Sequence, residues 1–470
     1  MSKIPFHASE CVAAFASGEL SATEIAQAAL ERIAAANPGL NAYTTITAER
    51  ALAEAGALDA ARARGVAPPL AAVPYAVKNL FDIEGLTTLA GARINAGNPP
   101  AGADAPLLRR MGEAGALLTG ALNMDALAYG FTTENSHYGV TRNPRDPGRI
   151  AGGSSGGSGA AVAAGLVPIA LGSDTNGSIR VPASLCGVFG LKPTFSRLPR
   201  TGSFPFVASL DHLGLLAASA TDLALAYDVL QGPESADPAC AQRGVEATLG
   251  VLERGVEGLR IARLGGYFDD HASPMAQWAA RLAAATLGAR EVVELPGTAQ
   301  ARAAAFVITA AEGGALHLAA LRDRAEDFEP LSRERLTAGT LVPAAWTQRA
   351  QRHRSWFRLQ AMALFEHFDL LIAPATPVTA TVIGQESFEL GGRSVPTRAN
   401  MGLLTQPISF IGLPVAVAPL WPEGGLPGLP ILPIGVQLIA PAWREDLCLR
   451  AARALEQASI ADARITSAAP

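Results

Sequence analysis

The stretch "AGGSSGGSGA", residues 151–160, contains five glycines and three serines. A run of this composition is usually a flexible linker. Here it leads directly into "AVAAGLVPIALGSDTNGSIRVPASLCGVFGLKPT", residues 161–194, which is apolar and rich in small residues. Such a segment is typical of a buried core. A linker has no reason to enter the interior, so the glycine–serine run is a candidate framework around a functional site.

The composition restricts the class of protein. The chain has 470 residues, of which 49% are hydrophobic and 17% are charged, which favours a compact globule over disorder. A formal net charge of −5 provides no basic surface for nucleic acid. Four widely spaced cysteines and an N-terminus without signal-peptide features predict a cytoplasmic protein. The apolar run near residue 160 is too short for a membrane span, and no metal-ligand spacing occurs, so we expect neither membrane nor metal.

Alternating helical and strand-like patterns predict an α/β fold with a large, twisted, mixed β-sheet covered by helices. Ser21 and Glu24 form a capping box that begins a helix, which we expect to end at "NPG" (37–39), and a second helix spans about 47–64. The apolar runs at 71–77, 115–121, 166–172, 369–375, 413–419 and 433–439 predict strands. Segments 231–244 and 421–433 are expected surface loops.

We expect a single domain spanning residues 1–470. Within it, the patterns indicate an N-terminal helical segment over about 1–65 and a core over about 66–230 and 365–470. The region of about 231–364 is expected to be more variable.

The residues Gly153, Ser155 and Gly157 match G-x-S-x-G, the nucleophile elbow of α/β-hydrolases. That elbow must follow a strand, whereas "TRNPRDPGRI" (141–150) reads as a turn-rich loop. The motif alone therefore gives little support to an α/β-hydrolase. A phosphate-binding loop is excluded because the G-K-[ST] sequence is absent.

Two further stretches suggest catalysis. In "GSDTNGSIRVP" (172–182), Ser178 follows Asn176 and Gly177, a turn that can direct several backbone N–H groups at one point, as an oxyanion hole requires. In "VPYAVKNLFD" (73–82), Lys78 follows an apolar run, and burial would lower its pKa and make it a base. Taken singly, each has an ordinary explanation, because a serine after glycine is usually a turn residue and a lysine usually reaches solvent.

Together these stretches resemble the amidase signature family, the serine amidases with a Ser–Ser–Lys triad. The resemblance rests on "VPYAVKNLFD", "GGSSGGS" and "LGSDTNGSIRVPASLCGVFGLKPT", and it extends to 121–144, 191–214 and "DLLIAPATP" (369–377). It weakens between about 240 and 360. The family's fold is the amidase signature fold, an α/β fold with a large twisted mixed sheet, which agrees with the pattern described above.

The resemblance implies a role for each matching residue. Ser178 would be the nucleophile, Lys78 the base, and Ser154 the bridge between them, with its peptide bond in the cis form. The backbone N–H groups of the oxyanion hole would belong to Thr175, Asn176, Gly177 and Ser178, and the supporting residues would be Ser155, Asp174 and Arg180. Many family members have glycine where this chain has Asn176, which suggests a particular branch. The family needs no cofactor and no metal.

Three segments narrow the expected substrate. Residues 79–95, 173–194 and 204–214 most resemble the branch that removes the terminal amide of 1-carboxybiuret as ammonia, in cyanuric acid degradation. Alternatives are the glutaminase component of tRNA-dependent amidotransferase, allophanate hydrolase, a broad-specificity amidase and an inactive scaffold protein. The resemblance also implies a homodimer with a small helical accessory subunit, hence a heterotetramer.

A carboxylated substrate would need a cation in the pocket, for which arginine is suited by its planar fork. In "LSRERLTAGTLVP" (331–343), the resemblance to the amidotransferase glutaminase points to Arg335, with Arg333 as the second choice. The alternative is that both arginines lie on an exposed helix face and pair with Glu334 or Asp327.

Overall fold

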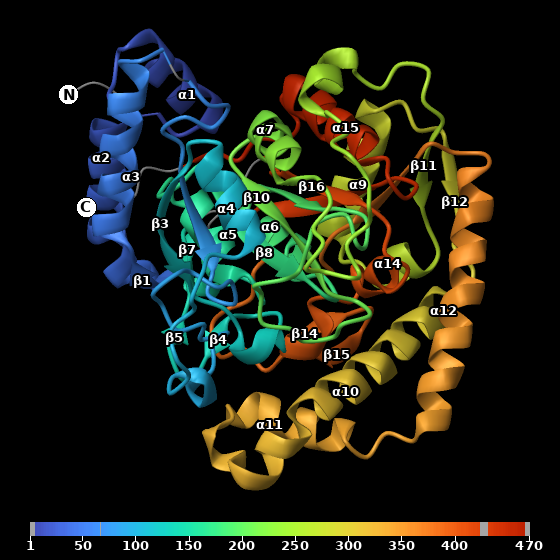
Figure 1. The fold of residues 1–470 in the computed structure, drawn as a ribbon. Helices are drawn as coiled ribbons and strands as arrows, with labels where there is room; N and C mark the ends of the chain where they lie inside the picture. The colour runs from blue at the N-terminus through green and yellow to red at the C-terminus, as the bar shows by residue number, and fades with distance from the viewer. Residues whose placement is uncertain (1–4, 66, 424–430, 466–470) are drawn as a thin grey trace.

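The computed structural model describes residues 5–65, 67–423 and 431–465. An eleven-stranded mixed sheet runs through the molecule in the order β1-β3-β2-β8-β10-β9-β16-β17-β13-β11-β12 (Figure 1). Its strands are β1 (Tyr43–Ile46), β2 (Pro74–Lys78), β3 (Leu117–Leu122), β8 (Ile169–Asp174), β9 (Phe189–Lys192), β10 (His212–Ala217), β11 (Ile261–Leu264), β12 (Glu291–Val293), β13 (Leu370–Pro374), β16 (Val415–Leu420) and β17 (Ile434–Ile439). The predicted fold class is therefore confirmed.

The six apolar runs of the sequence are all strands of this sheet. Every residue of β2, β3, β8, β13, β16 and β17 is buried, as expected for strands covered on both faces. Short hairpins lie outside the sheet: β4 (Glu134–Asn135) with β5 (Gly139–Val140), β6 (Arg142–Asn143) with β7 (Asp146–Ile150), and β14 (Ser387–Leu390) with β15 (Arg393–Pro396). The expected variable region supplies β11 and β12 to the main sheet, and the single-domain organisation stays a prediction.

Helices cover both faces of the sheet, and further helices lie beside its two edges (Figure 1). The helices at the N-terminal side are α1 (Ala8–Ser17), α2 (Ala22–Leu40) and α3 (Ala48–Arg62). Those that pack on the sheet include α5 (Gly156–Ala163), α6 (Arg180–Cys186), α7 (Ala220–Leu230), α9 (Pro274–Thr286) and α15 (Glu445–Gln457). The remaining helices are α4 (Pro106–Glu113), α8 (Tyr267–Asp270), α13 (Thr397–Asn400) and α14 (Gln406–Phe410).

Three helices, here called the helical arm, lie along the bottom and the right-hand side of Figure 1: α10 (Thr298–Asp323), α11 (Pro330–Gly339) and α12 (Ala344–Phe365). Helix α10 contacts α11, α12 and α14. By length and composition alone, α10 is also apolar enough to cross a membrane, a test that the core helices of soluble proteins pass as well. The apolar run near residue 160, for which no membrane span is expected, does not include this helix.

Two local predictions were wrong. Helix α2 does not end at "NPG" but continues through Pro38 to Leu40, where Asn41 closes it in the left-handed conformation with φ 52°. A proline in the last turn removes one backbone hydrogen bond without ending the helix. Residues 141–150 form the β6–β7 hairpin rather than a loop. Segment 231–244 contains no helix or strand, as predicted, and part of segment 421–433 lies outside the described residues.

Candidate active site

A fully buried lysine and two serines meet at the carboxyl ends of neighbouring strands. Lys78 is the last residue of β2, and its Nζ lies 2.6 Å from Ser154 Oγ and 2.8 Å from Ser173 Oγ. Strand β2 is parallel to β8, which carries Ser173 one residue before its end. The Gly153–Ser154 peptide bond is cis, as the resemblance implies. The glycine–serine run therefore directs Ser154 into the interior, and continues as α5.

Ser178 lies on the turn that follows β8. The backbone N–H of Ser155 donates to the carbonyl of Ser178 at 3.2 Å, which fixes this turn against the glycine–serine run. Ser178 is 3% exposed, and its Oγ forms no hydrogen bond with Ser154 or with any other described residue. The structure thus joins Lys78 to Ser154 directly, and it joins the nucleophile turn to Ser155 through the backbone.

The backbone donors of this turn are unoccupied. The N–H groups of residues 175–178 donate to no acceptor among the described residues. Gly177 has φ 141°, and a Cβ there would lie 2.0 Å from Thr405 Oγ1, so only glycine fits. Adjacent free N–H groups can stabilise a developing oxyanion.

A buried ion pair supports the turn from behind. Arg180 donates to both carboxylate oxygens of Asp174, from Nε at 2.9 Å and from Nη2 at 3.0 Å, and both side chains are fully buried. Its Nη1 also donates to the Thr405 carbonyl and to Gln437 Oε1. Burial alone would raise the pKa of Asp174, but the Arg180 guanidinium outweighs it and holds that pKa below its usual range. Ser155 Oγ donates to the Ser173 carbonyl at 3.1 Å.

Burial controls the protonation of Lys78. Removal from water disfavours the ammonium form and lowers the pKa of Lys78 from 10.5 to about 7, although nearby Asp125, Asp174 and Asp211 act to raise it. A large fraction of Lys78 is then neutral near pH 7. A neutral amine at 2.6 Å from Ser154 Oγ can accept that hydroxyl proton.

A narrow pocket opens at Ser178 and contains Arg335. The pocket is lined by Ser178, Asn176, Phe306, Arg335 and Gln406, among others. The Arg335 guanidinium lies over the Tyr129 ring, 3.7 Å from its centroid, and no carboxylate of the described residues is within ion-pair distance of it. Arg333 instead pairs with Glu326 at 2.7 Å, outside the pocket. The structure brings Arg335 to the candidate site and leaves Arg333 away from it.

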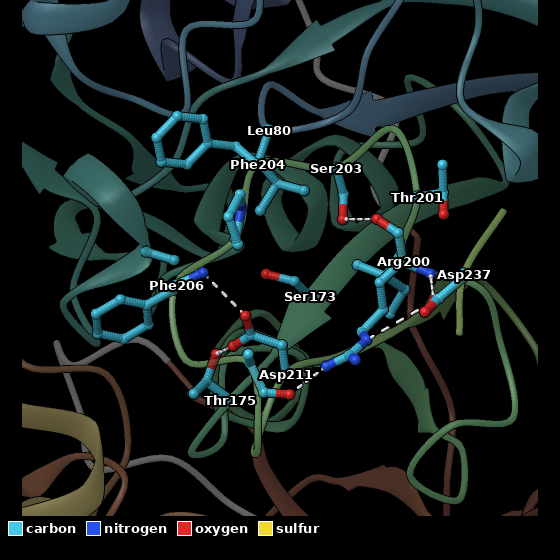
Figure 2. Close-up of a pocket in the computed structure, with 14 residues that line it drawn as sticks. Leu80, Ser173, Thr175, Arg200, Thr201, Ser203, Phe204, Phe206, Asp211 and Asp237 are labelled. Atoms are coloured by element: carbon cyan, nitrogen blue, oxygen red, sulfur yellow. Dashed lines mark hydrogen bonds and ion pairs between the residues drawn. The ribbon is translucent and has the colours of Figure 1, made fainter. Parts of the chain in front are cut away.

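A larger cavity of about 210 Å³ adjoins Ser173, the second hydrogen-bond partner of Lys78 (Figure 2). Ser173 points into it, and Asp211, Arg200 and Asp237 line its polar side. Asp211 accepts hydrogen bonds from Thr175 Oγ1 at 2.6 Å and from the N–H groups of Phe206 and Val207. Ala128, Thr175 and Phe206 line both this cavity and the pocket at Ser178, so the two spaces adjoin at these three residues.

Sequence reasoning missed three residues of the site: Ser173, Arg302 and Gln406. Ser173 lies within the quoted "GSDTNGSIRVP" stretch, but its contact with Lys78 spans 95 residues of chain. Arg302 donates from Nε to Gln406 Oε1 at 3.0 Å, across 104 residues. No local pattern signals either contact. Among residues 5–65, 67–423 and 431–465, no three His, Cys, Asp or Glu side chains cluster as metal ligands would.

Comparison with known proteins identifies relatives of the whole chain. The profile of the family described as Amidase matches residues 24–449. The chain is 60% identical to AtzE, the 1-carboxybiuret hydrolase component of Pseudomonas sp. (strain ADP), over 96% of this chain and 98% of that protein. It is 37% identical to the A component of the glutamyl-tRNA(Gln) amidotransferase of Chloroflexus aurantiacus (strain ATCC 29366 / DSM 635 / J-10-fl), over 95% of each.

A solved structure shares this fold with a TM-score of 0.95 and 59% identity, covering 97% of this chain and all of that one. It is described as an unexpected vestigial protein complex that reveals the evolutionary origins of an s-triazine catabolic enzyme. With the family profile matched across most of the sequence, the chain belongs to the amidase family and is an amidohydrolase.

Proposed function

We propose that the protein hydrolyses the terminal amide of 1-carboxybiuret, releasing ammonia and forming urea-1,3-dicarboxylate. The observation that carries this proposal is Arg335, a cation without an acidic partner among the described residues, in the same pocket as Ser178. A substrate carboxylate would provide that partner. The 60% identical relative is named for this reaction, which supports the same substrate.

In the proposed mechanism, Lys78 acts as the base and Ser154 relays the proton. Neutral Lys78 accepts the Ser154 hydroxyl proton while Ser154 takes the proton of Ser178, whose Oγ attacks the scissile carbonyl. The resulting oxyanion receives hydrogen bonds from the free N–H groups of Thr175, Asn176, Gly177 and Ser178. Donors of this kind contribute roughly 3–4 kcal/mol each in measured oxyanion holes.

The same groups would complete the reaction. Protonated Lys78 returns its proton through Ser154 to the departing nitrogen, so that ammonia leaves and an acyl-enzyme remains. Water then attacks the ester, with Ser154 and Lys78 again removing the proton, and Ser178 leaves with a proton. Asp174, Arg180 and Ser155 act by holding the turn and the serine run in position. The mechanism requires no cofactor.

A glutaminase role, as one component of an amidotransferase, is the main alternative. The Chloroflexus aurantiacus amidotransferase component is 37% identical to this chain, compared with 60% for the 1-carboxybiuret hydrolase component. The choice of substrate is tested by measuring ammonia release from 1-carboxybiuret, biuret, allophanate, glutamine and indoleacetamide with the purified chain. We expect the highest kcat/KM with 1-carboxybiuret, and a higher value with glutamine would overturn the proposal.

We further propose a cytoplasmic heterotetramer of two copies of this chain and two small helical subunits. The s-triazine enzyme of similar fold is described as a protein complex. Helix α12 and the segment before it expose large apolar side chains, with Leu341 78%, Trp346 57% and Leu359 65% accessible. Exposed apolar residues that gather on one arm are typical of a protein interface.

A further inference from the structure

Gln406 presents an amide group to the pocket at Ser178, and chemistry fixes its orientation. Its Oε1 accepts a hydrogen bond from Arg302 Nε at 3.0 Å. A guanidinium has only donors, so the oxygen of the Gln406 amide must face Arg302 and its Nε2 must face away. Gln406 is 2% exposed, lines the pocket, and its Nε2 donates to no atom of the described residues.

Arg302 is itself held in one position. Its Nη2 donates to Asn400 Oδ1 at 2.8 Å and to the Ala399 carbonyl at 3.4 Å, and its guanidinium lies 4.9 Å from the centroid of the Phe306 ring. No carboxylate in the described part of the chain pairs with it. Because no carboxylate neutralises the guanidinium, its charge polarises the Gln406 amide and strengthens the N–H donors of that amide.

An amide donor that lines a pocket and has no protein partner can donate to an acceptor of a ligand bound there. Three acceptor groups exist in 1-carboxybiuret. The scissile carbonyl would occupy the oxyanion hole, and the carboxylate would pair with Arg335. The remaining acceptor is the internal carbonyl between the two N–H groups, and it has no other partner in the proposed mechanism.

We propose that Gln406 Nε2 donates to this internal carbonyl and that Arg302 is the positioning residue that orients Gln406. The pair would select acylureas over simple amides, independently of the selection for a carboxylate by Arg335. This inference rests on the proposed function, because it takes its acceptor from the proposed substrate.

Four compounds distinguish recognition of the internal carbonyl by Gln406 from recognition of the carboxylate by Arg335. Both the carboxylate and the internal carbonyl are present in 1-carboxybiuret, whereas biuret has only the internal carbonyl. Glutaramate, in which three methylenes replace –NH–CO–NH–, has only the carboxylate, and butyramide has neither. For each compound, kcat/KM is measured, or the competitive inhibition constant where turnover is too slow.

The variants are Gln406→Met, which keeps length but removes the donor, and Arg302→Leu. Each should lower kcat/KM, or weaken inhibition, by about 10- to 100-fold with 1-carboxybiuret and biuret, as expected for the loss of one buried hydrogen bond. Glutaramate and butyramide should change by less than about 3-fold. Arg302→Lys, which restores a donor to Gln406 Oε1, should recover part of the loss. Arg322→Leu, an exposed position on the same helix, should change none of the four.

The double variant is decisive for positioning. If Arg302 acts through Gln406, then Gln406→Met combined with Arg302→Leu should be no worse than Gln406→Met alone. Equal losses on all four compounds, or additive losses in the double variant, would overturn the inference. A wild-type enzyme inactive on 1-carboxybiuret would overturn the proposed function, whereas the Gln406 inference would still be decided by the ratio of biuret to butyramide.

Discussion

Lys78 Nζ lies 2.6 Å from Ser154 Oγ, and both side chains are fully buried. At this distance a proton can pass between the two groups without water. The direction of transfer depends on the protonation state of Lys78, which burial shifts toward the neutral amine. The catalytic competence of the site is therefore tied to a titration near neutral pH.

The first prediction concerns this titration. The pKa of Lys78 is lowered to about 7 by burial, so the neutral base predominates above that value, and kcat/KM should rise between about pH 6 and pH 8. Lys78→Met should remove this rise and lower activity by several orders of magnitude. The matched control is the same substitution at Lys192, because burial also lowers the pKa of Lys192 to about 7. Its Nζ donates to the Pro193 carbonyl at 3.0 Å and forms no hydrogen bond with the serines. Persistence of the pH limb in Lys78→Met would exclude Lys78 as the base.

A second prediction separates the serines. Ser178→Ala should abolish turnover, because the proposed nucleophile lies on the turn whose free N–H groups would form the oxyanion hole. Ser155→Ala should keep a measurable rate, because its Oγ contacts only the Ser173 backbone. Single-turnover ammonia release gives both rates. If Ser178→Ala kept more than about a hundredth of the wild-type rate, the proposed nucleophile would be wrong.

The arginines of α11 provide the third prediction. Arg335→Ala should reduce kcat/KM with 1-carboxybiuret by roughly 2–5 kcal/mol in transition-state binding, and far less with biuret, because only the first has a carboxylate. Arg333→Ala should weaken transition-state binding by less than about 1 kcal/mol with either substrate, because the Arg333–Glu326 pair is exposed. The same loss on both substrates would remove Arg335 from substrate recognition.

A fourth prediction tests the ion pair behind the turn. Arg180→Met leaves Asp174 charged and buried without its partner, which should cost about 3–5 kcal/mol in the free energy of unfolding. Arg444→Met removes an exposed pair with Asp446 and should cost less than about 1 kcal/mol. Urea denaturation at pH 7 measures both. Similar midpoints for the two variants would contradict a structural role for the Asp174–Arg180 pair.

The fifth prediction concerns assembly. Co-expression with the small subunit should give a native mass of two copies of each chain by analytical ultracentrifugation. Leu359→Glu places a charge on the exposed apolar side of α12 and should release smaller species, with triad geometry unaffected. A lone wild-type chain that stayed monomeric, soluble and fully active would argue against the heterotetramer.

Much of the sheet could be predicted, because its central strands are buried on both faces and therefore appear in the sequence as continuous apolar runs. Strands β11 and β12 could not, because they are only four and three residues long and β12 is largely exposed. The end of α2 could not be predicted either, because Pro38 resembles a stop signal, although a proline near a helix terminus loses only one hydrogen bond.

The residues of the site also differ in whether they could be predicted from the sequence. Lys78, Ser154 and Ser178 could be found because they occur in distinctive local stretches. Arg302 and Gln406 could not, because neither stretch is unusual by itself and their contact depends on how α10 packs against α14. Arg335 could be predicted only through the resemblance, and its position over the Tyr129 ring depends on tertiary packing.

Helices α10 and α11 of the helical arm carry Arg302, Phe306 and Arg335. The reacting groups instead come from residues 78–178, on the sheet and its turns. Under the proposed function, bond cleavage is encoded between residues 78 and 178, and the choice of amide is encoded in α10, α11 and α14. Substitutions in these three helices would then redirect an ancestral amidase to a new nitrogen source while the apparatus that breaks the bond is inherited unchanged.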